Sequence, residues 1–136
     1  MSSPPLPSYL LDVSALIALG VRQHQFHVRV ATWVELRQFS SLLTCPTTEL
    51  GFVRILGQTP AYASNFDQAK LQLARLKTNS KYSIRFLADD QDADGLPAWV
   101  KTSNQTTDGH LLQLAQAHSA KLATLDTGIP GAFVIP

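Results

Sequence analysis

The segment that decides the fold is YLLDVSALIAL, which runs from Tyr9 to Leu19. Its first part, through Val13, predicts a buried β-strand, and Ala15–Leu19 predicts a short helix directly after it. Asp12 lies between the two and carries the one charge in an otherwise largely apolar stretch. An isolated buried charge is very costly, so the Asp12 carboxylate must be paired, protonated or bound to a ligand.

The rest of the chain repeats this order of strand and then helix. Further strands are expected at 42–45, 82–87, 121–125 and 132–135. Further helices are expected over 28–38, 47–56, 66–76 and 106–120. We expect a threonine cap on the helix from residue 47, Thr107 as the cap of the last helix, and mostly loop over 88–105. The alternation predicts a single three-layer α/β/α domain, residues 1–136, with a central parallel sheet and a flexible N-terminus over 1–8.

Length and composition exclude several classes of protein. A chain of 136 residues with 45% hydrophobic residues can bury a core as one domain. The net charge of +1 does not by itself indicate a nucleic-acid-binding protein. The single cysteine, Cys45, excludes an internal disulfide and a cysteine zinc site, and fits a reducing cytoplasm. The opening MSSPPLPS lacks the basic start of a signal peptide, and no apolar run reaches the roughly 18 residues of a membrane span.

Four of the ten acidic residues occupy one kind of position in the expected fold. Asp12 and Asp126 end strands, whereas Glu49 and Asp108 lie in the first turns of helices. In a parallel sheet these positions share one edge, where four carboxylates would repel unless cations neutralised them. Hard divalent cations such as Mg²⁺ prefer oxygen ligands of this kind. Taken singly, a first-turn acid has another explanation, because it complements the helix dipole, whereas a helix cap would explain Asp12 only in part.

Three segments resemble the PIN-domain ribonucleases, and most of all the VapC-type toxins of bacterial toxin–antitoxin pairs. These segments are LLDVSALIAL, CPTTELGFVRIL and TTDGHLLQLAQAHSAKLATLD, and HQFHVRVATW is also similar. The resemblance extends from Tyr9 to about Ile129. It implies that Mg²⁺ or Mn²⁺ activates a water that cleaves RNA, leaving a 5′-phosphate and a 3′-hydroxyl. The implied catalytic and metal-binding residues are Asp12, Glu49, Asp108 and Asp126.

The same resemblance implies supporting residues and partners. Ser14, Thr107 and Thr124 adjoin the acids and would orient carboxylates or metal-bound waters, although capping or strand packing also explains them. The implied partners are an RNA substrate such as tRNA or rRNA, a cognate VapB-like antitoxin whose tail occupies the site, and a second copy in a homodimer. A non-catalytic PIN-like binding module and a DNA nuclease are the alternative functions.

Three weaker patterns complete the sequence. The loop from Asp90 to Gly95 copies half of a calcium-binding EF-hand, but Lys101 stands where the bidentate glutamate belongs, so we expect a solvated acidic loop. His24 and His27 are candidates for contact with RNA or a partner. A local gathering of basic residues either guides RNA phosphates or forms a solvated helix face. Its members are Lys70, Arg75, Lys77, Lys81 and Arg85.

Overall fold

The computed structural model describes residues 6–37 and 40–136, and these residues form a five-stranded parallel sheet in the order β3-β2-β1-β4-β5. The strands are β1 (Ser8–Leu11), β2 (Ser41–Thr44), β3 (Ile84–Phe86), β4 (Lys121–Thr124) and β5 (Phe133–Val134). The central strand is β1, where Leu10 lies opposite Leu43 of β2 and Leu122 of β4. Whatever follows β1 therefore lies between the ends of two neighbouring strands.

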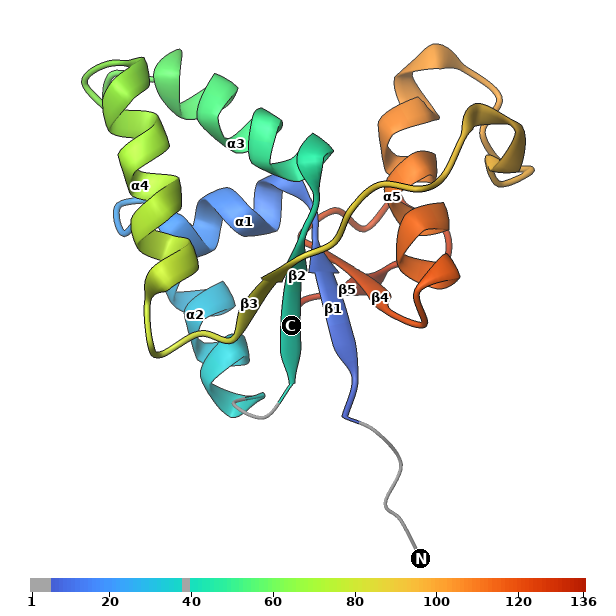
Figure 1. Cartoon of the computed structure of the whole chain (residues 1–136), viewed down its shortest axis with the longest axis horizontal. Helices are drawn as coiled ribbons and strands as arrows, with labels where there is room; N and C mark the ends of the chain where they lie inside the picture. Colours follow the sequence, from blue (N-terminus) through green and yellow to red (C-terminus); the bar gives the residue numbers. More distant parts are fainter. Residues whose placement is uncertain (1–5, 38–39) are drawn as a thin grey trace, which may run out of the picture.

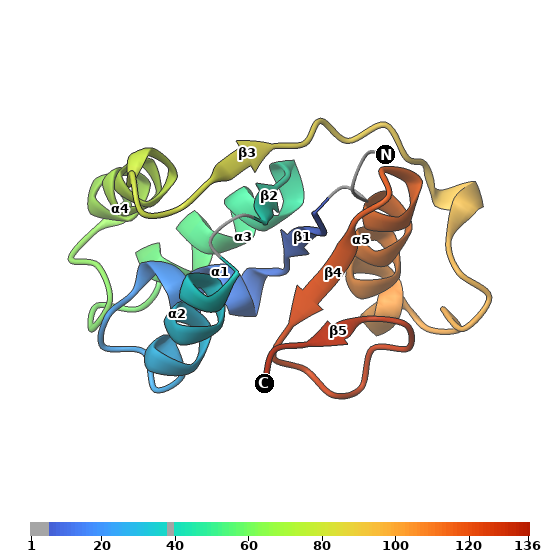
Figure 2. The ribbon, with the colours of Figure 1, turned by 90° about the horizontal axis from the view of Figure 1, so that it is seen from below.

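Helices cover both faces of this sheet. They are α1 (Val13–Gly20), α2 (His27–Leu36), α3 (Pro46–Gly57), α4 (Phe66–Thr78) and α5 (Thr106–Ala117). Figure 1 shows α1 to α4 on one face and α5 on the other, and Figure 2 shows the sheet running between them from β3 to β5. This arrangement confirms the predicted three-layer α/β/α fold. None of the helices in the described ranges is long and apolar enough to cross a membrane.

The central strands β1, β2 and β4 carry buried apolar residues on both faces because each face of the sheet packs against helices there, whereas the edge strand β3 is partly exposed. Along β1, Tyr9 and Leu11 belong to the apolar core under α1 to α4, whereas Leu10 belongs to the core under α5. In the same way, Ala123 of β4 faces the first core and Leu122 faces the second. Alternate residues point to opposite faces of a strand, so an unbroken apolar run is what a sheet buried on both sides requires.

Several element boundaries differ from those predicted. Ser8, which was predicted to be part of a flexible N-terminus over 1–8, is the first residue of β1 and pairs with Ser41 of β2. Residues 1–5 of that predicted segment lie outside the described residues. The helix predicted over 28–38 starts at His27, and its last predicted residue also lies outside the described ones. These shifts of a residue or two are ordinary, because fraying ends give weak sequence patterns.

The two predicted threonine caps are wrong. The cap of α3 is Cys45, and Thr48 supports it through hydrogen bonds with the Cys45 backbone. The cap of α5 is Gln105, because a short 3-10 helix, Ser103–Gln105, runs directly into α5. Thr107 therefore lies inside the first turn of α5, where its side chain is exposed.

Candidate active site

Asp12 joins β1 to α1 at the carboxyl end of the sheet. It caps α1: its Oδ1 accepts hydrogen bonds from the Ala15 backbone N–H at 2.9 Å and from Ser14 Oγ at 2.8 Å. Its Oδ2 accepts a hydrogen bond from the hydroxyl of Thr124, the last residue of β4. These bonds fix both carboxylate oxygens in one orientation.

The Asp12 carboxyl lies in an unfavourable electrostatic environment. The residue is 6% exposed, and among the described residues no basic side chain forms an ion pair with it. Burial raises its pKa above the usual value, and this effect outweighs the three hydrogen bonds that lower it, while the charge of Asp126 raises it further. The hydrogen bonds explain how the carboxylate is oriented, but they leave its charge uncompensated.

Asp108 and Asp126 line the same pocket as Asp12, a hollow of about 510 Å³. Asp108 is in the first turn of α5, and its pKa is raised first by burial and then by the charges of Asp12 and Asp126. Asp126 follows β4; its backbone N–H donates to Thr124 Oγ1 at 2.9 Å, and its Oδ1 accepts from the Gly128 N–H at 2.7 Å. The Thr124 hydroxyl thus touches both acidic segments, donating to one and accepting from the other.

Glu49 is held apart from these three acids. It lies in the first turn of α3 and is not among the residues that line the pocket. Its Oε2 accepts a hydrogen bond from Thr44 Oγ1 at 2.6 Å and lies 2.9 Å from the ammonium of Lys77 in the last turn of α4. The structure therefore brings three of the four predicted acids to one pocket and places the fourth in an ion pair.

The donor set suits a hard divalent cation in kind. Carboxylate oxygens are the ligands that Mg²⁺ and Mn²⁺ prefer, and a buried carboxylate without a cationic partner gains most from a bound cation. In the conformation seen over residues 6–37 and 40–136, no three acidic, histidine or cysteine side chains lie close enough to surround one ion. The three pocket acids therefore need side-chain adjustment to share a cation.

Of the expected supporting residues, Ser14 and Thr124 contact Asp12 directly, whereas Thr107 lines the pocket beside Asp108. The structure also adds wall residues that the sequence did not single out for the site. These are Val13, Ile17, Ile55, Tyr62 and Leu111, together with His24, which was a candidate for RNA contact. Tyr62 lies in the loop between α3 and α4, where no local pattern links it to a sheet edge.

The acidic loop after β3 is largely exposed, as predicted, and two of its side chains also contact histidines. Asp89 pairs with His110 of α5, and Asp90 Oδ1 lies 3.0 Å from Nε2 of His118, the residue that caps the end of α5. Hydrogen bonds from the Gln91 and His118 side chains hold the pKa of Asp90 below its usual value. These contacts hold Asp89 and Asp90 beside α5, whereas Asp92 and Asp94 are exposed to solvent.

The basic gathering is partly neutralised as well. Lys70 pairs with Asp67 at 3.6 Å, Lys77 pairs with Glu49, and Arg75 and Lys81 line a hollow formed largely by α1, α2 and α4.

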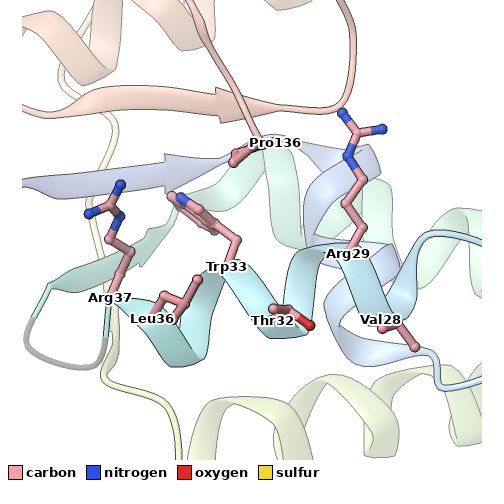
Figure 3. A pocket seen from close by; sticks show the side chains of 7 residues that line it. All are labelled: Val28, Arg29, Thr32, Trp33, Leu36, Arg37 and Pro136. Atoms are coloured by element: carbon pink, nitrogen blue, oxygen red, sulfur yellow. The ribbon is translucent and has the colours of Figure 1, made fainter.

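Figure 3 shows a further hollow on α2 beside Pro136, and none of its lining side chains is a carboxylate. Its lining consists of Val28, Arg29, Thr32, Trp33, Leu36, Arg37 and Pro136. Among these hollows, the one at the sheet edge is where Asp12, Asp108 and Asp126 meet.

Comparison with known proteins gives consistent results over almost the whole chain. The model of the PIN domain family matches residues 9–132. Ribonuclease VapC38 of Mycobacterium tuberculosis is 36% identical over 122 residues, which cover 88% of this chain and 86% of that protein. Ribonuclease VapC29 of the same species is 36% identical over 124 residues, with the same coverage. Ribonuclease VapC44, also from that species, is 32% identical over 134 residues, which cover 90% of this chain and 92% of that protein.

Proposed function

The chain belongs to the PIN domain family and is a VapC-type ribonuclease by similarity, and from that premise we propose that it is a divalent-metal-dependent endoribonuclease, the toxin of a toxin–antitoxin pair. One observation carries the metal dependence. The buried Asp12 carboxylate has no basic partner among the described residues and faces the same pocket as Asp108 and Asp126. Three carboxylates in one pocket are expected to be stable at neutral pH when a cation offsets their charge.

The chain's own residues have distinct roles in this proposal. Asp12, Asp108 and Asp126 would hold Mg²⁺ or Mn²⁺, and Glu49 would join them once it leaves Lys77. When bound, the cation supplies a more acidic water and offsets negative charge on the phosphodiester. Thr124 and Ser14 keep the Asp12 oxygens in one orientation through hydrogen bonds that are already present. Thr107, which lines the same pocket, would orient bound water.

The proposal can be tested by incubating the purified 136-residue chain with RNA and with DNA of the same sequence. RNA cleavage is expected with Mg²⁺ or Mn²⁺ and not with EDTA. Asp12→Asn and Asp108→Asn should each lose cleavage, whereas Asp90→Asn, in the loop held by His118, should retain it. Undiminished cleavage in EDTA contradicts the metal requirement. Faster cleavage of DNA favours a DNA nuclease, and absence of all cleavage favours a binding module.

The proposed partners are an RNA such as tRNA or rRNA, a VapB-like antitoxin and a second copy of the chain. Co-expression with the small protein encoded next to this one should relieve growth inhibition in bacteria. Light scattering on the purified chain should give twice the mass of one chain. Growth inhibition that no neighbouring protein relieves argues against the toxin–antitoxin assignment while leaving the nuclease assignment intact.

A further inference from the structure

The pocket at the sheet edge is lined by two kinds of side chain. Its lining contains the three acids and, besides them, a set of apolar and aromatic side chains that we call the wall. The wall is formed by Val13, Ile17, Ile55, Leu111, His24 and Tyr62. Coordination of a cation by carboxylates requires no such wall, and a phosphate group gains nothing from apolar contact. The wall therefore fits a different part of a substrate.

The two aromatic rings of the wall lie close together, and hydrogen bonds stabilise the loops that carry them. The ring centroids of His24 and Tyr62 are 6.0 Å apart, with their planes tilted by 38°. A hydrogen bond of 2.9 Å from Gln23 Nε2 to the carbonyl of Ala61 joins the two loops that carry these rings. The Tyr62 backbone N–H also donates to the Thr59 carbonyl at 2.8 Å, and this bond closes a turn over residues 59–62. The rings form a preorganised surface because both loops are tied to each other.

His24 is held in one tautomer. The backbone N–H of Phe26 donates to Nδ1 of His24 at 3.0 Å, so Nδ1 carries the lone pair and the ring proton is on Nε2. Burial, and then the charge of His27, hold the pKa of His24 below its usual value, so the ring is neutral at neutral pH. The wall thus presents two uncharged aromatic rings. It also presents the Nε2–H of His24 as a hydrogen-bond donor, because the contact with Phe26 uses only Nδ1.

We propose that His24 and Tyr62 form a subsite for a nucleobase of single-stranded RNA, next to the bond that the three acids of the pocket would cut. The proposal rests on the ribonuclease function proposed above and extends it to the base. Single-stranded RNA is commonly recognised by bases that leave the stack and lie against aromatic side chains. Such stacking tolerates every base, because each has a flat face, and the Nε2–H of His24 is a donor for the acceptors that every base carries at its edge.

Charge favours the same occupant. Phosphates are repelled by the three carboxylates until a cation is bound, so the uncharged base is the part of a nucleotide that this pocket attracts by itself. The wall is continuous with the acids, because Asp12, Val13 and Ser14 are consecutive residues that all line the pocket. A base on the wall would therefore hold its own phosphate beside the carboxylates.

The test uses fluorescein-labelled single-stranded RNA 20-mers of random sequence. Binding is followed by fluorescence anisotropy in EDTA at low ionic strength, where the proposed reaction does not run. Tyr62→Ala should bind about tenfold more weakly, as expected for the loss of one stacked base, whereas Tyr62→Phe should stay within twofold of wild type. His24→Leu keeps the apolar volume but removes the aromatic ring and its N–H, and should weaken binding about fivefold. It keeps the test valid if Tyr62→Ala fails to fold.

Phe66→Ala is the matched control, because Phe66 is an exposed aromatic residue that lines a different hollow, between α3 and α4. Its affinity should equal that of wild type. In cleavage assays with Mg²⁺, Tyr62→Ala should raise KM about tenfold with kcat within twofold, which a loss of folding or of metal does not produce.

Wild-type affinity and unchanged KM in both Tyr62→Ala and His24→Leu overturn the subsite while leaving the nuclease intact. Wild-type protein that binds no RNA overturns the subsite and the proposed function together. Weaker binding by Tyr62→Ala in a protein that never cleaves RNA supports the subsite and overturns the proposed catalysis.

Discussion

Asp108→Asn provides the most direct test of the charge argument at the site. Burial, Asp12 and Asp126 all shift the Asp108 pKa in the same direction, upward, whereas hydrogen bonds oppose burial at Asp12. The substitution removes the charge and almost preserves the shape of the side chain. Its effect on the free energy of unfolding therefore reports the electrostatic cost of placing a third carboxylate in the pocket.

The sign of the pH dependence follows from the raised pKa. A carboxyl group whose pKa is higher in the folded protein than in the unfolded chain makes folding favour the protonated form. That contribution is present below the unfolded value of 3.8 and is lost as pH rises through the raised folded pKa. In EDTA, Asp108→Asn should therefore melt higher than wild type at pH 7, and the difference should shrink toward zero near pH 4.

One opposing effect has to be measured separately. A negative charge in the first turn of a helix typically stabilises it by about 0.3–1 kcal/mol, and Asp108 occupies that turn of α5. Asp67 occupies the first turn of α4 on the protein surface, so Asp67→Asn loses a similar helix-dipole contribution without affecting the pocket. For 136 residues, 1 kcal/mol corresponds to about 3–4 °C in Tm. Asp67→Asn should thus melt about 1–4 °C below wild type at pH 7, in contrast to Asp108→Asn.

Metal completes the experiment. Mg²⁺ at a hundredfold excess over its Kd stabilises a protein by about 2.7 kcal/mol, which here is about 9 °C. Wild type and Asp67→Asn should both gain this much at pH 7, whereas Asp108→Asn should gain far less because one ligand has lost its charge. Differential scanning fluorimetry from pH 4 to 8, with EDTA and with Mg²⁺, measures every arm. Equal Mg²⁺ shifts in Asp108→Asn and wild type would refute the assignment of Asp108, and a lower Tm of Asp108→Asn in EDTA would refute the argument from repulsion.

Three further substitutions test neighbouring parts of the site and its support. Lys77→Met frees Glu49 from a partly buried ion pair worth about 1 kcal/mol. The Mg²⁺ concentration that gives half of the thermal stabilisation should therefore fall about fivefold. An unchanged concentration would mean that Glu49 does not reach the metal. Gly51→Ala places a Cβ 2.6 Å from Val13 Cγ2, so α1 and α3 must separate, and urea denaturation should show a loss of about 1–3 kcal/mol. Thr124→Val removes the hydroxyl donor to the buried carboxylate, which should cost about 1–3 kcal/mol at pH 7 and clearly less near pH 4.

The order of elements was predictable largely because the central strands β1, β2 and β4 pack against helices on both faces, whereas the edge strand β3 is partly exposed. Apolar runs such as Leu42–Cys45 are produced by that burial, so the sequence pattern and its physical cause coincide. The caps were not predictable in the same way. A threonine is the better capping residue in isolation, but the backbone enters α3 at Cys45, and a 3-10 helix that runs directly into α5 makes Gln105 the cap. Both outcomes depend on where the preceding segment is packed, which local preference does not encode.

In the candidate site too, some residues could be predicted from the order of elements, whereas others depend on tertiary packing. Asp12, Asp108 and Asp126 could be assigned to one edge because topology alone places strand ends and first helical turns there. The pairing of Glu49 with Lys77 depends on how α3 and α4 pack against each other, and the residues are 28 positions apart. Tyr62 joins the pocket because Gln23 binds the backbone of its loop, a contact across 38 positions. Long-range contacts of this kind follow from tertiary packing and leave no periodic pattern.

Thr124 shows how the fold supports an otherwise unfavourable group of charges. The parallel pairing of β1 with β4 brings the end of β4 beside the residue after β1, so a hydroxyl 112 positions away donates to Asp12. The same oxygen accepts from the Asp126 backbone, which fixes the direction of the donor and with it the orientation of the Asp12 carboxylate. The hydrogen bonds stabilise one geometry of the acids without neutralising them. The remaining electrostatic cost therefore lies at the sheet edge, where a cation would remove it.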